Sequence, residues 1–248
     1  MEDRSSPRYY IGTSGWHYDH WRGLYYPEEV PKPKWLQLYA GQFNTVELNN
    51  SFYHLPSEKA FSTWRGSTPD EFVLAVKVSR FITHIKRLRN LGTALENFLS
   101  RATFLGNKLG PLLYQLPPNM KRNDEVLKNF LSSLPQEYQH VFEFRNESWI
   151  DASVFHILEQ YDAGFCAFDM PGFNCPLVAT SSFAYIRFHG AESLYSSCYT
   201  DEELLRWADR ISALGKNLQA VYIYFNNDAE AFAIKNAVTL IKCLGLKK

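Results

Sequence analysis

The strongest constraint on the fold is a series of eight short apolar runs along the 248 residues. Each run has four to seven residues and is rich in aromatic or β-branched side chains, as β-strands are. The runs span residues 9–13, 45–49, 72–78, 112–116, 140–145, 165–168, 184–188 and 220–225. Their spacing leaves room for a crossover between successive strands, which predicts that the strands are parallel.

Segments with helical spacing of apolar residues lie between most of these runs. They span residues 33–40, 93–105, 124–134, 148–161, 201–211 and 229–244. The connections 15–34 and 51–70 are longer than a barrel needs, and we expect both to be loops, the first of them aromatic. The alternation predicts the α/β class and a (β/α)8 TIM-type barrel with long aromatic βα loops, which occupies residues 1–248 as one domain.

Composition narrows the class of protein. Lys+Arg and Asp+Glu number 26 each, so no overall charge draws the chain towards nucleic acid or an anionic membrane. The four cysteines form no CxxC pair, which favours a reduced protein over a disulfide framework or a zinc site. No apolar run reaches the roughly 18 residues of a membrane span, and the polar N-terminus is unlike a signal peptide. We therefore expect a cytoplasmic protein that does not bind membranes.

Polar side chains gather at the downstream end of each run, which is the end where TIM barrels carry their sites. Because side chains alternate along a strand, the face opposite the bulky apolar residues should point to the barrel axis. This rule predicts an inward set that comprises Glu47, Lys77, Gln115, Glu143, Arg145, Asp169, Tyr185, Arg187, His189, Tyr222, Tyr224 and Asn226. Three carboxylates and three Lys or Arg side chains belong to this set.

Such a ring has two interpretations, because a buried charge must be paired, hydrated or poised for a ligand. One is a self-compensating network of salt bridges that holds the barrel together. The other, which we favour, is an enzyme site in which Lys77, Arg145 and Arg187 bind a phosphate- or carboxylate-bearing ligand. In a hydrolase or lyase of this kind, the catalytic candidates that orient the cations or transfer protons are Glu47, Glu143, Asp169 and His189.

A divalent-metal site is an alternative, since the same carboxylates and His189 offer oxygen and imidazole ligands. The three neighbouring cations raise the cost of placing a doubly charged ion among them. We therefore predict no metal ligands and no other cofactor, and we keep a metal-dependent hydrolase as a competing hypothesis.

Residues 77–89 form a basic segment in this neutral chain, with five positive charges and no acid. The segment, which includes Arg80 and His84, is either a solvated surface or a contact for phosphate groups. The aromatic residues of the first long loop would then stack on bases, as in proteins that bind single strands. A module that binds DNA or RNA is therefore the alternative from a different functional class.

The first run ends in Gly12-Thr-Ser-Gly15, which is either a turn with amides that face an anion or a tight strand exit. Neither the Walker spacing nor the dinucleotide fingerprint is present, and no nucleophile elbow surrounds Ser14. Ser14 is therefore a candidate for binding a ligand and not for nucleophilic attack.

Seven short motifs follow one another along nearly the whole chain. They are Gly12-Thr-Ser-Gly-Trp16, Val46-Glu-Leu-Asn-Asn-Ser-Phe-Tyr53, Lys77-Val-Ser-Arg-Phe-Ile-Thr-His84, Gln115-Leu-Pro-Pro118, Glu143-Phe-Arg-Asn-Glu-Ser-Trp149, Arg187-Phe-His-Gly190 and Tyr224-Phe-Asn-Asn227. Together they resemble the signature set of the YecE-like family, domain of unknown function 72. The resemblance implies a TIM-type barrel of bacterial or archaeal origin whose biochemical activity is not established, although some members have been suggested to resemble metal-dependent endonuclease barrels that bind DNA.

The inward ring and these motifs together define the candidates for ligand binding. They are Ser14, Trp16, Asn49, Tyr53, Lys77, Arg80, His84, Gln115, Arg145, Trp149, Arg187 and Asn226. One departure is visible: this chain has Asn146 where the resemblance implies a histidine, in the pattern Arg-His-x-Ser-Trp. If that histidine transfers protons or binds a ligand, an amide cannot replace it, and we expect altered activity.

Overall fold

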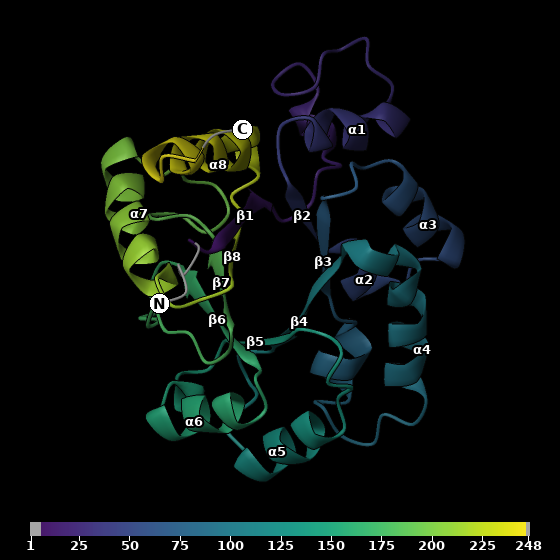
Figure 1. The fold of residues 1–248 in the computed structure, drawn as a ribbon, viewed down its shortest axis with the longest axis vertical. Helices are drawn as coiled ribbons and strands as arrows, with labels where there is room; N and C mark the ends of the chain where they lie inside the picture. Colours follow the sequence, from purple (N-terminus) through teal and green to yellow (C-terminus); the bar gives the residue numbers. More distant parts are fainter. Residues whose placement is uncertain (1–5, 247–248) are drawn as a thin grey trace.

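The structure, a computed structural model, describes residues 6–246 and shows eight strands surrounded by helices (Figure 1). The strands are β1 (Arg8–Thr13), β2 (Thr45–Leu48), β3 (Val73–Lys77), β4 (Leu109–Leu116), β5 (His140–Phe144), β6 (Gly164–Asp169), β7 (Phe183–Phe188) and β8 (Ala220–Phe225). Their order in the sheet is β1-β8-β7-β6-β5-β4-β3-β2, and each paired neighbour is parallel. The predicted (β/α)8 TIM-type barrel is confirmed.

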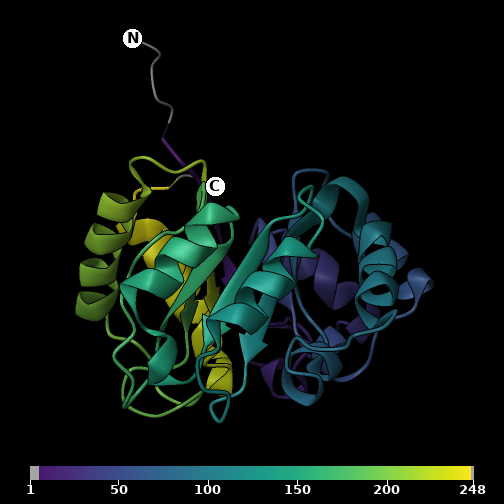
Figure 2. The same cartoon turned by 90° about the horizontal axis from the view of Figure 1, so that it is seen from below.

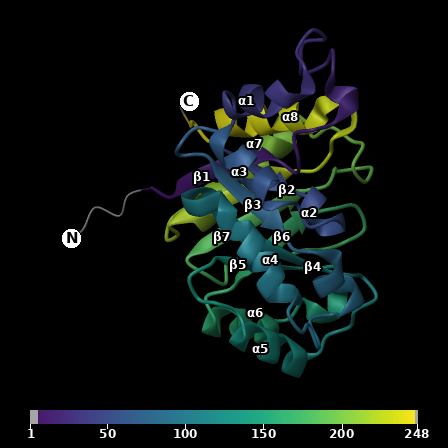
Figure 3. The same ribbon diagram turned by 90° about the vertical axis from the view of Figure 1, so that its right-hand side faces the viewer.

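Helices form the outer layer. The α-helices are α1 (Trp35–Ala40), α2 (Asn50–Tyr53), α3 (Glu58–Gly66), α4 (Ala94–Ala102), α5 (Asp124–Ser132), α6 (Ala152–Gln160), α7 (Asp201–Gly215) and α8 (Phe232–Cys243). Shorter turns are the 3-10 helices η1 (Asp19–Trp21), η2 (Lys32–Lys34), η4 (Thr103–Lys108), η5 (Glu147–Trp149) and η6 (Ala229–Ala231), and the π-helix η3 (Phe81–Ile85). Figure 3 shows α5 beside α6 at one end of the molecule, and the view from below places helices in front of the strands (Figure 2).

Two connections differ from the expected pattern. The segment 51–70, expected to be a loop, contains α3 and most of α2. Ser57 caps α3 by accepting a hydrogen bond from the Ala60 amide (3.2 Å). Phe61 is the one fully buried side chain of this helix, so the sequence shows no helical repeat of apolar residues here. Between β6 and β7, the described residues 170–182 form no helix.

The first long connection is aromatic, as expected, and it is packed against the barrel. Trp21, Tyr26 and Trp35 are buried, and the rings of Tyr26 and Trp35 stack with centroids 4.3 Å apart. The Tyr26 hydroxyl donates to the Trp16 carbonyl (2.7 Å), which fixes the start of this loop above β1. The loop is therefore a structured wall beside the strand ends.

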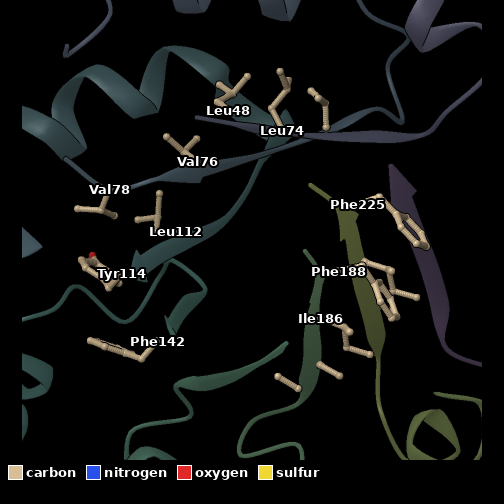
Figure 4. Close-up of a cluster of buried hydrophobic side chains, with 14 of the residues drawn as sticks. Leu48, Leu74, Val76, Val78, Leu112, Tyr114, Phe142, Ile186, Phe188 and Phe225 are labelled. Atoms are coloured by element: carbon tan, nitrogen blue, oxygen red, sulfur yellow. The ribbon is translucent and has the colours of Figure 1, made fainter. Parts of the chain in front are cut away.

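The core has two layers, one on each face of the sheet. The outer layer lies between strands and helices, and Figure 4 shows part of it, including Leu74, Val76, Leu112, Ile186 and Phe188. The inner layer fills the barrel and consists of Ala75, Leu113, Val141, Cys166, Phe183, Tyr185, Ala220, Tyr222 and Tyr224. The alternation used to predict the inward set is thus observed on both sides of the sheet.

The barrel wall is irregular at the seam between β1 and β2. These strands share a single isolated bridge, Ser14 to Glu47, in place of a continuous ladder. Side-chain hydrogen bonds connect the rest of the two strands. Asn44 Oδ1 accepts a hydrogen bond from the Ile11 backbone N–H (3.2 Å), and Asn44 Nδ2 donates one to the Tyr9 carbonyl (2.8 Å). Farther along, the Tyr39 hydroxyl accepts from the Thr13 amide (2.8 Å) and donates to the Thr45 carbonyl (3.2 Å). Side-chain hydrogen bonds therefore close the barrel here.

Within residues 6–246, no helix is both long enough and apolar enough to cross a lipid bilayer.

Candidate functional site

The centre of the barrel mouth is an ion triad built on Arg187. This side chain extends inward from β7 and is 1% exposed. One guanidinium nitrogen donates to Glu143 Oε2 on β5 (2.7 Å) and another to Glu47 Oε1 on β2 (2.8 Å), and both carboxylates are fully buried. A planar guanidinium can serve two carboxylates in this way because its N–H groups point in fixed, divergent directions.

Further donors complete the coordination of the two carboxylates. The Tyr185 hydroxyl donates to Glu47 Oε2 (2.6 Å), while Gln115 (2.6 Å) and Arg145 Nε donate to Glu143 Oε1. Burial alone raises the pKa of Glu143, but Arg145 and Arg187 outweigh it and hold that pKa well below its usual value. Glu143 is therefore ionised in the folded protein and serves as an anchor for cations.

His189 follows β7 and is fully buried beside the triad. An Arg145 N–H faces its Nε2 (2.7 Å), and its Nδ1 lies 3.0 Å from the Asn226 amide nitrogen. Because a guanidinium can only donate, Nε2 must be the acceptor. Burial, with Arg187 and Arg145 nearby, lowers the pKa of His189 well below its usual value. The imidazole is therefore neutral, which suits a positioning group and not a proton donor.

Asp169 differs from its predicted orientation. It lies on the same face of β6 as Phe165 and Ala167, which belong to the outer core layer, and its Oδ2 accepts from the Tyr199 hydroxyl (2.8 Å). Both faces of β6 are apolar, so the sequence pattern did not distinguish them, and the acid was wrongly placed inside. The inward position on this strand belongs to Cys166.

This correction changes the charge balance of the ring. The inward charged groups are two carboxylates, Glu47 and Glu143, against three cations, Lys77, Arg145 and Arg187, instead of three against three. His189 is neutral and does not alter the difference. The ring thus carries one positive charge in excess.

Lys77, at the end of β3, holds that excess charge. Within residues 6–246 its ammonium has neither a hydrogen-bond partner nor an ion-pair partner, and it lies 4.2 Å from the centre of the Phe52 ring. Burial, and then the charge of Arg187, lowers the pKa of Lys77 to about 8. Lys108 is a useful contrast, because its buried ammonium donates to the carbonyls of Arg65 (2.8 Å) and Thr68 (2.7 Å).

A cavity of about 510 Å³ opens over Lys77 and Arg187. Its remaining walls are Gly15, Trp16, His17, Tyr18, Asn49, Asn50, Tyr53, Tyr195, Asn226 and Asp228. Two buried polar atoms of its lining residues lack a hydrogen-bond partner among the described residues: Asn49 Oδ1, an acceptor, and Arg187 Nε, a donor. The cavity therefore combines an ammonium without a hydrogen-bond or ion-pair partner with amide side chains and aromatic walls, which is the composition of a small-molecule site.

The other predicted site residues have structural contacts. Ser14 is buried and its hydroxyl lies 3.4 Å from Arg187. Trp149 is in the core, where it stacks on Phe144. Asn146 caps η5 by accepting from the Ser148 amide (3.1 Å) and donates to the Pro118 carbonyl (2.7 Å), so the residue found in place of the expected histidine has a structural role.

His84 and Arg80 do not line this cavity. His84 lies in η3, where its ring packs edge to face with the Phe52 ring, and its Nδ1 is 2.9 Å from the Thr83 hydroxyl. Burial, and then the charge of Lys77, lowers the pKa of His84 to about 4. Arg80 is exposed at the start of the same helix.

Six lining residues were not among the candidates: Gly15, His17, Tyr18, Asn50, Tyr195 and Asp228. Asp228 comes directly after the Asn-Asn pair that follows β8, so its place near a strand end could have identified it as a candidate for the site. Burial raises the pKa of Asp228, whose Oδ2 lies 3.4 Å from His20 Nε2. Tyr195 comes from the loop after β7, and nothing in the sequence around it indicates that the loop folds back over the cavity.

No three His, Cys, Asp or Glu side chains among residues 6–246 come together in a group that could hold a metal ion. The carboxylates that the sequence offered as ligands are instead bound to Arg187, and Asp169 lies on the other face of its strand. The described part of the chain thus supplies no donor set for the metal-dependent hydrolase.

Comparison with known proteins agrees with this architecture. The chain is 26% identical to the UPF0759 protein YunF of Bacillus subtilis, over 96% of this chain and 95% of that one. It is 34% identical to the UPF0759 protein YecE of Escherichia coli over 46% of this chain and 45% of the relative.

Two solved structures share the fold. A DUF72 family protein from Thermotoga maritima superposes with a TM-score of 0.87 at 30% identity, covering 96% of this chain and 99% of that one. A DUF72 family protein from Enterococcus faecalis gives a TM-score of 0.82 at 18% identity, covering 97% and 96%. A family model described as protein of unknown function DUF72 matches residues 10–248, and the chain belongs to this family.

Proposed function

We propose that this chain is a cytoplasmic barrel enzyme that binds a small phosphate- or carboxylate-bearing molecule in the cavity over Lys77. The observation that carries the proposal is the unpaired ammonium of Lys77 in a ring with one more cation than carboxylates. Arg187 and Arg145 are already engaged by Glu143, so Lys77 is the cation in the cavity wall that remains to meet an anion. The ion triad of Arg187, Glu143 and Glu47 then forms the base of the cavity and holds the Arg187 side chain in a fixed position.

The ligand should also carry hydroxyl groups. The cavity wall includes the side chains of Asn49, Asn50, Asn226 and Tyr53. Amide and phenol groups both donate and accept hydrogen bonds, so they can pair with hydroxyl groups of a ligand. A hydroxylated phosphate or carboxylate therefore fits the cavity better than a purely apolar anion does. The reaction class stays at the level of a hydrolase or lyase, as the sequence indicated.

Substitution of Lys77 tests this proposal. We expect glycerol 3-phosphate or glycerate to bind about ten- to a hundredfold more weakly to Lys77→Met, because a charge-assisted hydrogen bond is lost. Met should not impair folding, since it removes an unpaired charge and keeps the contact with Phe52. Isothermal titration calorimetry measures the affinity, and chemical denaturation checks the fold.

The pH dependence provides the matched control. Lys77 has a lowered pKa of about 8, so its ammonium is present below that pH and is lost above it. Binding to the wild type should fall about tenfold per pH unit above 8, until the pKa of the bound form is reached. Lys77→Arg keeps its charge and should bind with a flat profile. Equal affinity of the wild type and Lys77→Met, or a flat wild-type profile, contradicts the proposal.

A nucleic-acid-binding role is the second candidate, favoured by the surface of η3. Phe81 is 41% exposed and Ile85 is 60% exposed, with the exposed Arg80 and Arg89 close in sequence. The exposed Phe81 ring among cations suits stacking on a base combined with contacts to phosphates. Binding of a single-stranded oligonucleotide at about 50 mM salt, measured by fluorescence anisotropy, should weaken steeply as salt rises and should be lost in Arg80→Ala/Arg89→Ala. Lack of binding at low salt rules this role out.

A further inference from the structure

We infer that Lys77 is a nucleophile that forms an imine with an aldehyde or ketone, so that the ligand of this site is a carbonyl compound bearing a phosphate or carboxylate. The inference deepens the proposed function and rests on it. It starts from a geometric fact: a lysine at a strand end lines the cavity and has no partner among residues 6–246.

The first step compares Lys77 with Lys108, a buried lysine whose ammonium is hydrogen-bonded. Lys108 is 4% exposed, and carbonyl oxygens of Arg65 and Thr68 accept its N–H bonds, as expected for an ammonium with a structural role. Lys77 is partly buried without any such acceptor. A structural role would need an acceptor to offset the desolvation of the charge, so Lys77 is arranged for a partner that arrives from outside.

The second step concerns the protonation state. The charged and titratable groups around Lys77 are Arg187 on β7, Glu143 on β5, Arg145 just after β5, Glu47 on β2 and His84 in η3. The two carboxylates are bound by Arg187, and their charges raise the pKa of Lys77 by less than burial and Arg187 together lower it. Burial and like charge therefore favour the neutral amine, and the pKa of about 8 leaves a substantial neutral fraction near neutral pH.

The third step is the chemistry. The neutral amine attacks the carbonyl carbon, a C–N bond forms, and the carbonyl oxygen becomes a hydroxyl group. Loss of that hydroxyl with the remaining amine hydrogen releases one water and leaves a C=N bond, so no oxidant or reductant is needed. Uptake of one proton from solvent then gives the protonated imine, which keeps a positive charge at Lys77, where the Phe52 ring at 4.2 Å already accommodates a cation.

The cavity suits the rest of such a ligand. The amide side chains of Asn49, Asn50 and Asn226 in its wall can donate to or accept from hydroxyl and oxygen groups next to the carbonyl. Trp16, Tyr18 and Tyr195 provide aromatic walls. The ligand class is therefore a hydroxylated aldehyde or ketone that carries an anionic group, and bond cleavage next to the imine carbon would make the enzyme a lyase.

Reductive trapping tests the inference. The full chain is incubated with pyridoxal 5′-phosphate, or with pyruvate as a carboxylate probe, and sodium borohydride then converts any imine into a stable amine. Peptide mass spectrometry locates the adducts. At pH 7.5 we expect Lys77 to be labelled about tenfold faster than the exposed Lys59 and Lys128, because its lowered pKa leaves part of its amine neutral and the cavity holds the probe beside it.

Lys77→Arg separates this inference from the proposed function, because it retains the charge but cannot form an imine. It should bind glycerol 3-phosphate more tightly than Lys77→Met does and should lose the trapped adduct at position 77. If Lys77 is labelled no faster than Lys59 and Lys128 while the wild type still binds the phosphate, the imine is excluded and the anion site stands. If neither occurs, both proposals fail.

Discussion

Replacing Arg187 by leucine should destabilise the folded protein by about 3–5 kcal/mol, the usual result of removing one partner of a buried ion pair. The reason is specific to this site. Glu143 would keep Arg145 and Gln115, whereas Glu47 would be left fully buried with the Tyr185 hydroxyl as its remaining partner. Urea unfolding measures the effect as a shift in the midpoint at constant slope.

Two comparisons make the Arg187 result specific. Glu47→Gln in the Arg187→Leu background should recover part of the lost stability, because it removes the orphaned charge. Arg122→Ala is the matched control, since Arg122 also bridges two carboxylates, Asp124 and Asp151, but at the surface, and its loss should change stability little. A loss of less than about 1 kcal/mol for Arg187→Leu would show that the triad does not support the fold.

The second large effect is expected at Gly12, in the seam between β1 and β2. A Cβ there would lie 2.2 Å from the Thr45 carbonyl oxygen and 2.7 Å from the Tyr39 hydroxyl, so the backbone would have to move. Gly12→Ala should therefore cost about 2–3 kcal/mol or more, at the upper end for overpacking. Differential scanning calorimetry should show a clearly lowered Tm.

Gly66→Ala is the control for Gly12, because a Cβ at Gly66 meets nothing within 4 Å. Both substitutions reduce the freedom of the unfolded chain to the same extent, so their difference reports the steric conflict. Gly66 also ends α3, where alanine is tolerated. Equal melting temperatures for the two variants would refute the tight packing of the seam.

Much of this architecture could be predicted from the sequence, for a physical reason. On β7 and β8, aliphatic residues such as Ile186 and Ile223 mark the helix-facing side, so alternation placed Tyr185, Arg187 and Tyr224 inside. On β6 this contrast is missing, and the polar residue was assigned to the wrong face. Alternation is informative where one face is distinctly more apolar than the other.

The sequence could not predict which charged side chains of the site form ion pairs with one another. That Arg187 binds both Glu47 and Glu143 depends on how strands far apart in the chain meet across the barrel, which no local pattern encodes. The same holds for Lys77, whose significance comes from the partners it lacks. Tyr195 reaches the cavity from a loop with φ of 63° at this residue, a conformation that hydrophobic periodicity does not indicate.

The irregular seam between β1 and β2 determines how a ligand in the cavity would affect the stability of the barrel. Gly15 and Trp16 follow β1, while Asn49 and Tyr53 follow β2, so the cavity lies across this irregular join. A ligand in the cavity would contact residues on both sides of the join. Because such a ligand binds only the folded barrel, its binding free energy would add to the stability of the fold at this join.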